Sequence, residues 1–175
     1  MIKILQENIE SENEILRKDC ELVKAKEFGT PELTKILNTM KKAASQDPDG
    51  VALAAPQVGV NKRIFVVVPD RGYSKDAKWR PEVFINPEII KSSSKVELKH
   101  EGCLSVRSIY GDTWRSTNVT VQAYDEKGNK FTFGAGGITA HIIQHETDHL
   151  DGVLFIDHGE NLVEDPNWRE HWDSK

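Results

Sequence analysis

The sequence predicts an α+β fold, in which antiparallel or mixed β-sheets pack around one central helix and a further helix lies nearer the N-terminus. Three observations support this prediction. Residues 30–44 have the apolar spacing of an amphipathic helix, several segments in the middle of the chain alternate like strands, and the apolar run 138–154 contains the pattern HExxH. Because no internal repeat or linker divides the chain, we expect one domain over residues 1–175, with a polar tail at 161–175.

The first helix is predicted to begin at Thr30, where a hydroxyl cap is followed by proline and then by an acid. Apolar residues recur at helical spacing after this cap: Leu33, Ile36, Leu37, Met40 and Ala44. The turn-forming sequence Asp-Pro-Asp-Gly at 47–50 then ends the helix. Residues 1–20 mix charged and apolar side chains, and we interpret them as a loop or short turn, with a firmer segment beginning at Glu14.

The middle of the chain is rich in strand-like segments, at 63–69, 82–90, 95–99, 117–125 and 130–133. A polar excursion at 70–81 separates the first two, and residues 126–129 are typical of a hairpin turn. Glycines at 134–137 are expected to end the last strand before the second helix, and a short strand is expected at 153–156.

The polar tail contains two tryptophans, Trp168 and Trp172, which are four residues apart. This spacing is compatible with a short terminal helix that docks through both rings, and equally with a loosely held tail.

The composition excludes several classes of protein. With 23 basic and 28 acidic side chains the formal net charge is -5, so broad binding to nucleic acid is not expected. The longest strand-like apolar run, residues 64–68, is far shorter than the ~20 residues that cross a bilayer, so we expect no membrane partner. Glutamates follow soon after the N-terminus, at Glu7, Glu10, Glu12 and Glu14. Their acidity argues against a signal or transit peptide, and we expect a cytoplasmic protein.

The pattern HExxH at residues 145–149 predicts a metal site. His145 and His149 are four residues apart, so a helix places them on one face, where they can bind one metal ion. Glu146 is next to the first histidine and is placed to act on a water at that ion. The alternative is an exposed polar helix face without a ligand. The metal interpretation indicates a metallohydrolase.

A third metal ligand must come from elsewhere in the chain. Phe155 occupies the position at which one class of metalloproteases supplies a third histidine. His141 is ~12 Å along the helix axis from His149, too far for both to bind one ion, so we interpret it as a polar wall or surface residue. Cys103 is the stronger candidate, because a thiolate and two imidazoles leave one position open for water. The alternative is a buried or free cysteine, which is our interpretation of Cys20.

Other side chains have two open interpretations. Apolar residues near the motifs would line a substrate pocket or belong to the ordinary core: Ile138, Ile142, Val51, Leu53 and Leu104. Asp148 would orient a metal ligand, or it would cap the helix or face solvent. Glu101 and Arg115 would form a buried pair that supports the site or, by default, an exposed pair of little energetic value.

Three blocks of sequence, in order, are similar to motifs of one family. Residues 50–57 (GVALAAPQ) are close to GxGxAAPQ, residues 101–105 are EGCLS, and residues 144–149 (QHETDH) match QHExDH. With these blocks the chain resembles peptide deformylase, and the likeness extends from about residue 14 to residue 157.

The resemblance implies an enzyme that removes the formyl group from the N-terminal formylmethionine of nascent polypeptides, through attack by a metal-activated water. It implies that Cys103, His145 and His149 bind the metal and that Glu146 is the general base and acid. Gln57 and the backbone N–H of Leu104 would stabilise the oxyanion. The residues expected to bind substrate are Gly50, Val51, Ala52, Leu53, Gly102, Ile138 and Ile142.

The resemblance also implies the cofactor and partners. One divalent metal is expected per chain, Fe²⁺ by likeness to the family, with Zn²⁺, Ni²⁺ or Co²⁺ able to substitute at a Cys-His-His set. N-formylmethionyl nascent peptides are the expected partners, and a transient ribosome contact is a further expectation.

The chain departs from the family pattern at three positions. Ala52 replaces the second glycine of the first block, Arg107 stands where proline is usual, and Gly136 replaces a common acid before the catalytic helix. Two rival functions are considered: a zinc endopeptidase, which shares HExxH but should have a different third ligand and an extended cleft, and a noncatalytic metal-binding or ribosome-associated module. None of the three departures removes a catalytic group. The presence of Glu146 argues against a noncatalytic module, because a purely structural metal site does not need a base.

Overall fold

The computed structural model describes residues 1–73, 75 and 80–166. It contains the helices α1 (Glu10–Leu16), α2 (Pro31–Gln46) and α3 (Gly137–Leu150). The strands are β1 (Ala52–Ala54), β2 (Ile64–Val67), β3 (Val83–Ser92), β4 (Val96–Cys103), β5 (Val106–Ser116), β6 (Asn118–Tyr124), β7 (Lys130–Gly136) and β8 (Glu160–Glu164). Short 3-10 helices occur at Ala25–Glu27, Ala55–Val58 and Phe155–Asp157. Trp168 and Trp172 lie outside the described residues, as does part of the excursion at 70–81.

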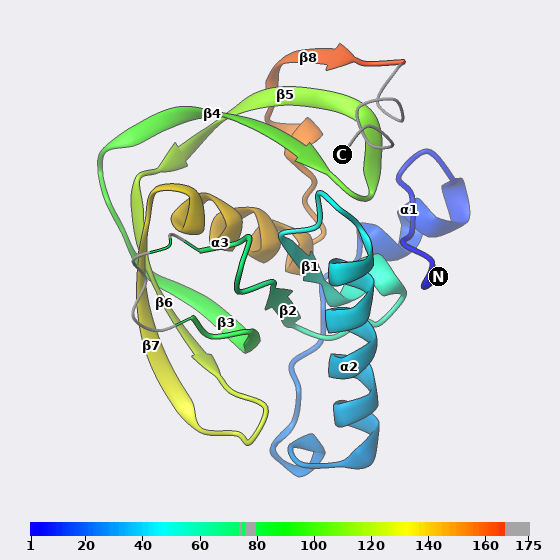
Figure 1. The fold of residues 1–175 in the computed structure, drawn as a ribbon, viewed down its shortest axis with the longest axis vertical. Helices are drawn as coiled ribbons and strands as arrows, with labels where there is room; N and C mark the ends of the chain where they lie inside the picture. Colours follow the sequence, from blue (N-terminus) through cyan, green and yellow to red (C-terminus); the bar gives the residue numbers. More distant parts are fainter. Residues whose placement is uncertain (74, 76–79, 167–175) are drawn as a thin grey trace.

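Two antiparallel sheets surround α3. One sheet has five strands in the order β1-β2-β3-β6-β7, and the other has three in the order β4-β5-β8. Figure 1 shows α3 running through the middle of the molecule, with β4 and β5 on one side and β3, β6 and β7 on another. The predicted α+β fold, with sheets packed around the HExxH helix, is confirmed.

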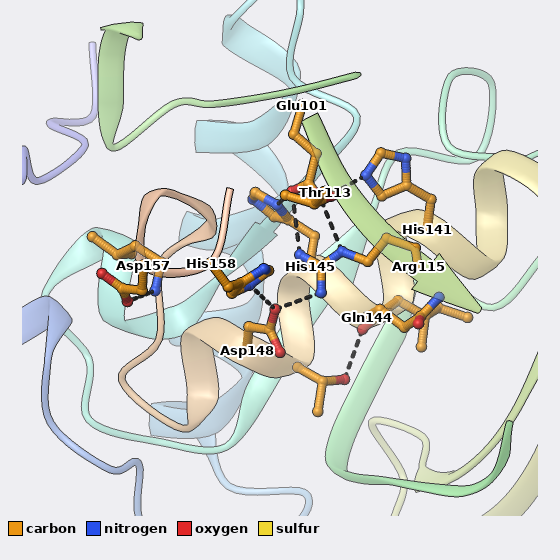
Figure 2. A network of polar contacts seen from close by, with 12 residues as sticks. Glu101, Thr113, Arg115, His141, Gln144, His145, Asp148, Asp157 and His158 are labelled. Atoms are coloured by element: carbon orange, nitrogen blue, oxygen red, sulfur yellow. Dashed lines mark hydrogen bonds and ion pairs between the residues drawn. The ribbon is translucent and has the colours of Figure 1, made fainter. Parts of the chain in front are cut away.

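The sequence of α3 explains its central position, because its apolar side chains pack against one sheet and its polar side chains face the other. Ala140, Ile143 and Leu150 pack into the core of the five-stranded sheet, together with Phe65 and Phe84. The polar side chains of the same helix face the three-stranded sheet, as Figure 2 shows for those that it labels. A helix buried on both sides can therefore supply core packing and reactive groups at once.

The predicted helix that starts at Thr30 is confirmed as α2. The Leu33 N–H donates to Thr30 Oγ1 over 3.2 Å, and Pro31 is the first helical residue, as expected for this cap. The apolar residues of α2 pack against strands of the five-stranded sheet in a second core cluster that includes Leu33, Leu37, Met40, Ala44, Ile64, Val66 and Ile85. This packing fixes the turn that follows α2, which leads directly into β1.

Most predicted strands are present, with bounds that differ by a few residues. The segments predicted at 63–69, 82–90, 117–125 and 130–133 correspond to β2, β3, β6 and β7. The segment predicted at 95–99 continues to Cys103, because β5 pairs with β4 from Val96 opposite Ser116 to Gly102 opposite Tyr110. The glycine stretch at 134–137 does end the preceding strand, but β7 continues through Gly134 to Gly136 before α3 begins.

Other expectations about elements were wrong. Residues 1–20 contain the helix α1. The segment predicted as a strand at 153–156 leads into a 3-10 helix, in which Leu154 and Phe155 are buried instead of pairing with a neighbouring strand. The strands β1, β5 and β8 had not been predicted. β1 and β8 are short and pair with strands outside their own segment, and β5 is irregular, with a shift in its pairing to both β4 and β8. Among the described residues, no helix has the length and apolar content needed to span a membrane.

Candidate metal centre and substrate pocket

The side chains of Cys103, His145 and His149 meet between α3 and the end of β4. One sulfur and two imidazole nitrogens lie within 4.8 Å of one another. The Cys103 Sγ is 3.2 Å from the His149 Nε2. Bonds of about 2.0–2.3 Å from nitrogen and sulfur would allow one ion to reach all three atoms. The ligand set expected from the sequence is therefore brought together in space.

Local structure places the thiol at this point. β4 ends at Cys103, and residues 104 and 105 form the tight connection to β5. The Ser105 N–H points to the sulfur at 3.4 Å, and Gln57 Nε2 lies 3.7 Å from it. These two donors suit a sulfur that carries negative charge, which is the form of cysteine that binds metals.

The helix α3 is fixed against β5 by Gln144. Its Oε1 accepts a hydrogen bond from the Ser116 N–H at 3.0 Å, and its Nε2 donates to the Ser116 carbonyl at 3.0 Å. Because Gln144 directly precedes His145, these two bonds set the position of the first histidine relative to the sheet that carries Cys103.

Glu101 is the centre of the polar network in Figure 2. Its Oε2 is 2.6 Å from His145 Nδ1, and its Oε1 is 3.0 Å from His141 Nε2. Arg115 donates to both oxygens, from Nε at 2.8 Å and from Nη2 at 3.3 Å, and the Thr113 hydroxyl also donates. With Nδ1 of His145 held by this carboxylate, its Nε2 remains available for a metal.

The network continues from Arg115 to Asp148 of α3. Arg115 Nη1 donates to Asp148 at 2.6 Å, and Asp148 also lies 3.4 Å from His158 Nε2. Asp148 therefore neither caps the helix nor contacts a candidate ligand, but orients the arginine that holds Glu101. The default interpretation of Glu101 and Arg115 as an exposed pair was wrong, because these residues are only 4% and 6% exposed.

The charges of this network shift several pKa values. Burial alone would raise the pKa of Glu101, but hydrogen bonds from His141, His145 and Arg115 outweigh it and lower that pKa strongly. Burial would lower the pKa of His145, yet its contacts with Cys103 and Glu101 raise it. For His149, burial and the neighbouring charge of His145 lower the pKa well below its usual range. His149 is therefore a neutral imidazole, the form that binds metals.

Glu146 is buried beside the candidate ligands. Burial raises its pKa to about 7, the charge of His145 opposes this shift, and the carboxylates of Glu101 and Asp148 add to it. Among the described residues, Glu146 Oε2 and His149 Nδ1 are buried polar atoms without a hydrogen-bond partner. Unpartnered buried polar atoms are uncommon and require an explanation. A metal ion with a coordinated water at this site would give Glu146 a partner, so the residues present fit a metal.

Gln57 is buried beside Cys103, where the sequence places an oxyanion donor. Its Oε1 accepts from the Ala54 N–H at 2.8 Å, and its Nε2 donates to the Ser105 hydroxyl at 3.0 Å. The carbonyl end of this side chain is thus fixed by the backbone, so the amide N–H₂ is directed toward the candidate centre. Leu104 lines the same pocket, and its carbonyl accepts from Gln6 Nε2 at 3.0 Å, which fixes the adjacent peptide plane.

A pocket of about 290 Å³ opens at the candidate centre. Most of the residues predicted for the site are in its lining: Gln57, Cys103, Leu104, His145 and Glu146, with Val51, Ala52, Gly102, Ile138 and Ile142. Gly50, Leu53 and His149 are not: Leu53 is fully buried in the core beneath α2, and His149 is buried behind the lining. A Cβ at position 50 would come within 2.1 Å of the Ala44 carbonyl oxygen, so close backbone packing explains this glycine.

Several residues of the site were not assigned a place there from the sequence. His141 is buried in the pocket wall and contacts Glu101. Its position one turn before the motif had suggested a polar wall or surface residue, but not this contact. Asp49, Arg107 and Tyr110 also line the pocket. No periodic signal marks them, because Asp49 lies in the turn after α2 and the pairing of β5 with β4 shifts register between Val106 and Tyr110. Gly136 precedes α3 without a side-chain cap, so the departure at this position removes no catalytic contact.

Comparison with known proteins identifies the family. The model of the polypeptide deformylases matches residues 5–165. The chain belongs to the polypeptide deformylase family. Peptide deformylase 2 of Gloeobacter violaceus is 45% identical over 141 residues, which cover 77% of this chain and 74% of that protein. Peptide deformylase 1 of Clostridium perfringens is 40% identical over 148 residues, which cover 85% and 93%.

Solved deformylase structures share the fold. The actinonin-bound class I type b peptide deformylase from Acinetobacter baumannii has a TM-score of 0.79 at 31% identity, covering 91% of this chain and 99% of that one. The peptide deformylase from Thermotoga maritima has a TM-score of 0.76 at 33% identity, covering 90% and 97%. The chain is thus a hydrolase, a metal-dependent deformylase that removes the formyl group from nascent polypeptides.

Proposed function

We propose that deformylation takes place in the pocket at the end of β4, and that Cys103, His145 and His149 hold one divalent metal ion there. The observation that carries this proposal is the meeting of one sulfur and two imidazole nitrogens within 4.8 Å, beside the buried carboxyl group of Glu146. Three protein ligands leave an open coordination position, which is the arrangement of a catalytic rather than a structural site.

The metal contributes acidity and charge. When bound, it lowers the pKa of a coordinated water toward neutrality and polarises the formyl carbonyl. We propose Fe²⁺ by likeness to the family, with Zn²⁺, Ni²⁺ or Co²⁺ able to replace it, since borderline ions suit a mixed sulfur and nitrogen set.

Glu146 moves the proton. Its carboxylate accepts a proton from the attacking water and then delivers it to the amide nitrogen, so that formate and a free N-terminal amine result. Its burial beside the candidate ligands leaves Oε2 without a hydrogen-bond partner among the described residues, so this oxygen is free to take up a proton and release it again. Glu101 holds His145 by its Nδ1 during this exchange and keeps the ring in one orientation.

Gln57 and Leu104 would stabilise the negative charge on the formyl oxygen. The Gln57 amide is preorganised by its bonds to Ala54 and Ser105, and the Leu104 peptide group follows Cys103 directly. A preorganised donor of this kind contributes about 3 kcal/mol to transition-state stabilisation, because it need not reorient during the reaction.

The pocket would receive the first side chain of the peptide. Val51, Ile138 and Ile142 give it an apolar wall that suits the side chain of methionine. The smallest acyl group, formyl, fits a narrow site at the metal, whereas larger acyl groups are excluded by size.

An anaerobic assay on formyl-Met-Ala, with metal analysis of the same sample, tests this proposal. We expect formate release with about one metal ion per chain, and no reaction with acetyl-Met-Ala. Cleavage of internal peptide bonds without formate release would instead support a zinc endopeptidase, and metal binding without either reaction would support a noncatalytic module.

We also propose that residues 1–175 form a single catalytic domain that works in the cytoplasm and contacts the ribosome transiently. Its substrates are nascent polypeptides, which supports both the location and the contact. Sedimentation of the protein with translating and with empty ribosomes tests this point.

A further inference from the structure

One edge of the pocket is formed by an irregular part of β5. Gly102 pairs with Tyr110 and Cys103 pairs with Val106, so the register between β4 and β5 skips Arg107, Ser108 and Ile109. We call Arg107–Ile109 the rim segment. All three of its residues line the pocket. A bulge of this kind bends a strand and redirects its side chains, here toward the pocket mouth.

The C-terminal strand fixes the rim segment from one side. Ile109 pairs with Glu164 of β8, and the Asp165 N–H donates to the Ser108 carbonyl at 2.7 Å. Ser108 has φ 67°, a left-handed conformation that is uncommon outside glycine. These backbone bonds hold the strained residue in place, so the rim segment has a defined position from which Arg107 projects.

Arg107 reaches from the rim segment to the opposite wall of the pocket. Its Nη2 lies 3.3 Å from the Asp47 Oδ2, with side-chain exposures of 28% for Arg107 and 5% for Asp47. Asp47 belongs to the turn after α2, which also carries Asp49 and leads to Val51, two residues of the pocket lining.

The turn after α2 is itself rigid. Arg71 donates to the carbonyl oxygens of Asp47 at 2.6 Å and Gly50 at 3.0 Å, and also to those of Pro48 and Ser45. The Asp49 N–H donates to Asp47 Oδ1 at 3.1 Å, which fixes the carboxylate that Arg107 contacts. The ion pair of Arg107 and Asp47 therefore joins two supported segments.

Two ties thus join the same pair of pocket walls. At the deep end, Gln57 donates to Ser105 at 3.0 Å, next to Cys103. At the outer end, Arg107 contacts Asp47. The first tie belongs to the proposed chemistry, whereas the second lies between segments that carry neither a proposed metal ligand nor the proposed base.

We propose that Arg107 and Asp47 form a clasp that sets the width of the pocket mouth and so determines which first side chains the enzyme accepts. The inference rests on the function proposed above. Arg107 is a positioning residue in this role, because it acts through the spacing of two walls rather than on the reacting atoms.

Kinetics on two substrates test the clasp. Formate release from formyl-Met-Ala and from formyl-Phe-Ala would be measured for the wild type, Arg107→Ala, Arg107→Lys, Asp47→Asn and the double variant of Arg107→Ala with Asp47→Asn. We expect the preference for methionine over phenylalanine, as a ratio of kcat/KM, to fall about fivefold in Asp47→Asn and in Arg107→Ala, the factor expected for one partly buried ion pair. The change should appear in KM, with kcat for formyl-Met-Ala and metal content unchanged.

The variants separate a clasp from the size of one side chain. Asp47→Asn keeps the whole Arg107 side chain, so a lower preference for methionine in this variant reports the loss of the ion pair. Because both single variants break the same pair, the double variant should show the same loss of preference as either of them. Arg107→Lys, which keeps the charge and most of the stem, should recover part of the preference. Lys99→Ala is the matched control, because Lys99 pairs with Glu97 on β4 and does not line the pocket.

Each remaining result has a distinct meaning. An unchanged preference in Asp47→Asn, with a change only in Arg107→Ala, would overturn the clasp and assign the effect to the volume of the arginine stem. Equal losses in kcat for both substrates would overturn it as well. Absence of formate release by the wild type would instead contradict the function proposed for the site. If Arg107→Ala fails to fold, Asp47→Asn and Arg107→Lys still decide the question.

Discussion

Replacing Glu101 by glutamine removes the charge at the centre of the polar network while keeping its shape. Arg115 is only 6% exposed, and the Glu101 carboxylate lies 2.6–3.3 Å from nitrogen atoms of His145, His141 and Arg115. Breaking a buried ion pair by removing one charge costs about 3–5 kcal/mol, because the remaining charge stays buried. Asp148 remains bound to Arg115 at 2.6 Å, so we expect the lower end, about 3 kcal/mol.

Two measurements follow from this estimate. In metal-free protein at pH 7, urea unfolding should show the loss of about 3 kcal/mol, and Tm should fall by roughly 6–12 °C for a chain of this size. In the metal-loaded variant, competition with a chelator should show metal affinity reduced by about 10- to 100-fold. The reason is that a carboxylate no longer holds the His145 ring at its Nδ1.

The matched control is Glu97→Gln, on the same strand. Glu97 contacts Lys95 and Lys99 but is 40% exposed, so its replacement should leave both stability and metal affinity nearly unchanged. The pKa of Glu101 is lowered in the folded protein, so its stabilisation is present above pH about 4.5 and is lost as the pH falls further. The difference between wild type and Glu101→Gln should therefore narrow below pH about 4.5. Equal effects of the two variants, with unchanged metal affinity, would refute the role assigned to the network.

Three further predictions concern the centre itself. Glu146→Ala should keep the metal but lower kcat by at least about 10²-fold, because no other described group is placed to transfer the proton; steady-state rates with metal analysis check this, and normal turnover would exclude Glu146 as the base. Cys103→Ala should lower metal content measured after dialysis, since only two ligands remain; unchanged content would exclude the thiol. In metal-free protein, burial raises the pKa of Glu146 from 4.5 to about 7, so the folded state binds the proton more tightly. The free energy of unfolding should therefore fall by about 3 kcal/mol as the pH rises from about 4.5 to 7, and this loss should be absent in Glu146→Gln. Urea unfolding at several pH values measures it. Parallel plots of unfolding free energy against pH for the two proteins would contradict the raised pKa.

The sequence identified the reactive groups because their signals are short and local. Spacing along one helix is enough to pair His145 with His149 and to place Glu146 beside them, and the block around Cys103 supplied the third candidate ligand. The helix α2 was equally clear, because its cap and its apolar stripe lie within one continuous segment. In contrast, β1 and β8 are short strands stabilised by partners outside their own segments, and β5 is irregular in its pairing, so their own residues carry little signal.

The sequence by itself therefore determined the α+β class, the helix that carries the motif and the kinds of atoms that can hold a metal. Only the tertiary structure decided that Glu101 is shared by His141, His145 and Arg115, and that Arg107 reaches Asp47 across the pocket. The physical reason is range: helix spacing and capping act over a few residues, whereas the pairing of charges depends on burial and on which distant segments the fold brings together.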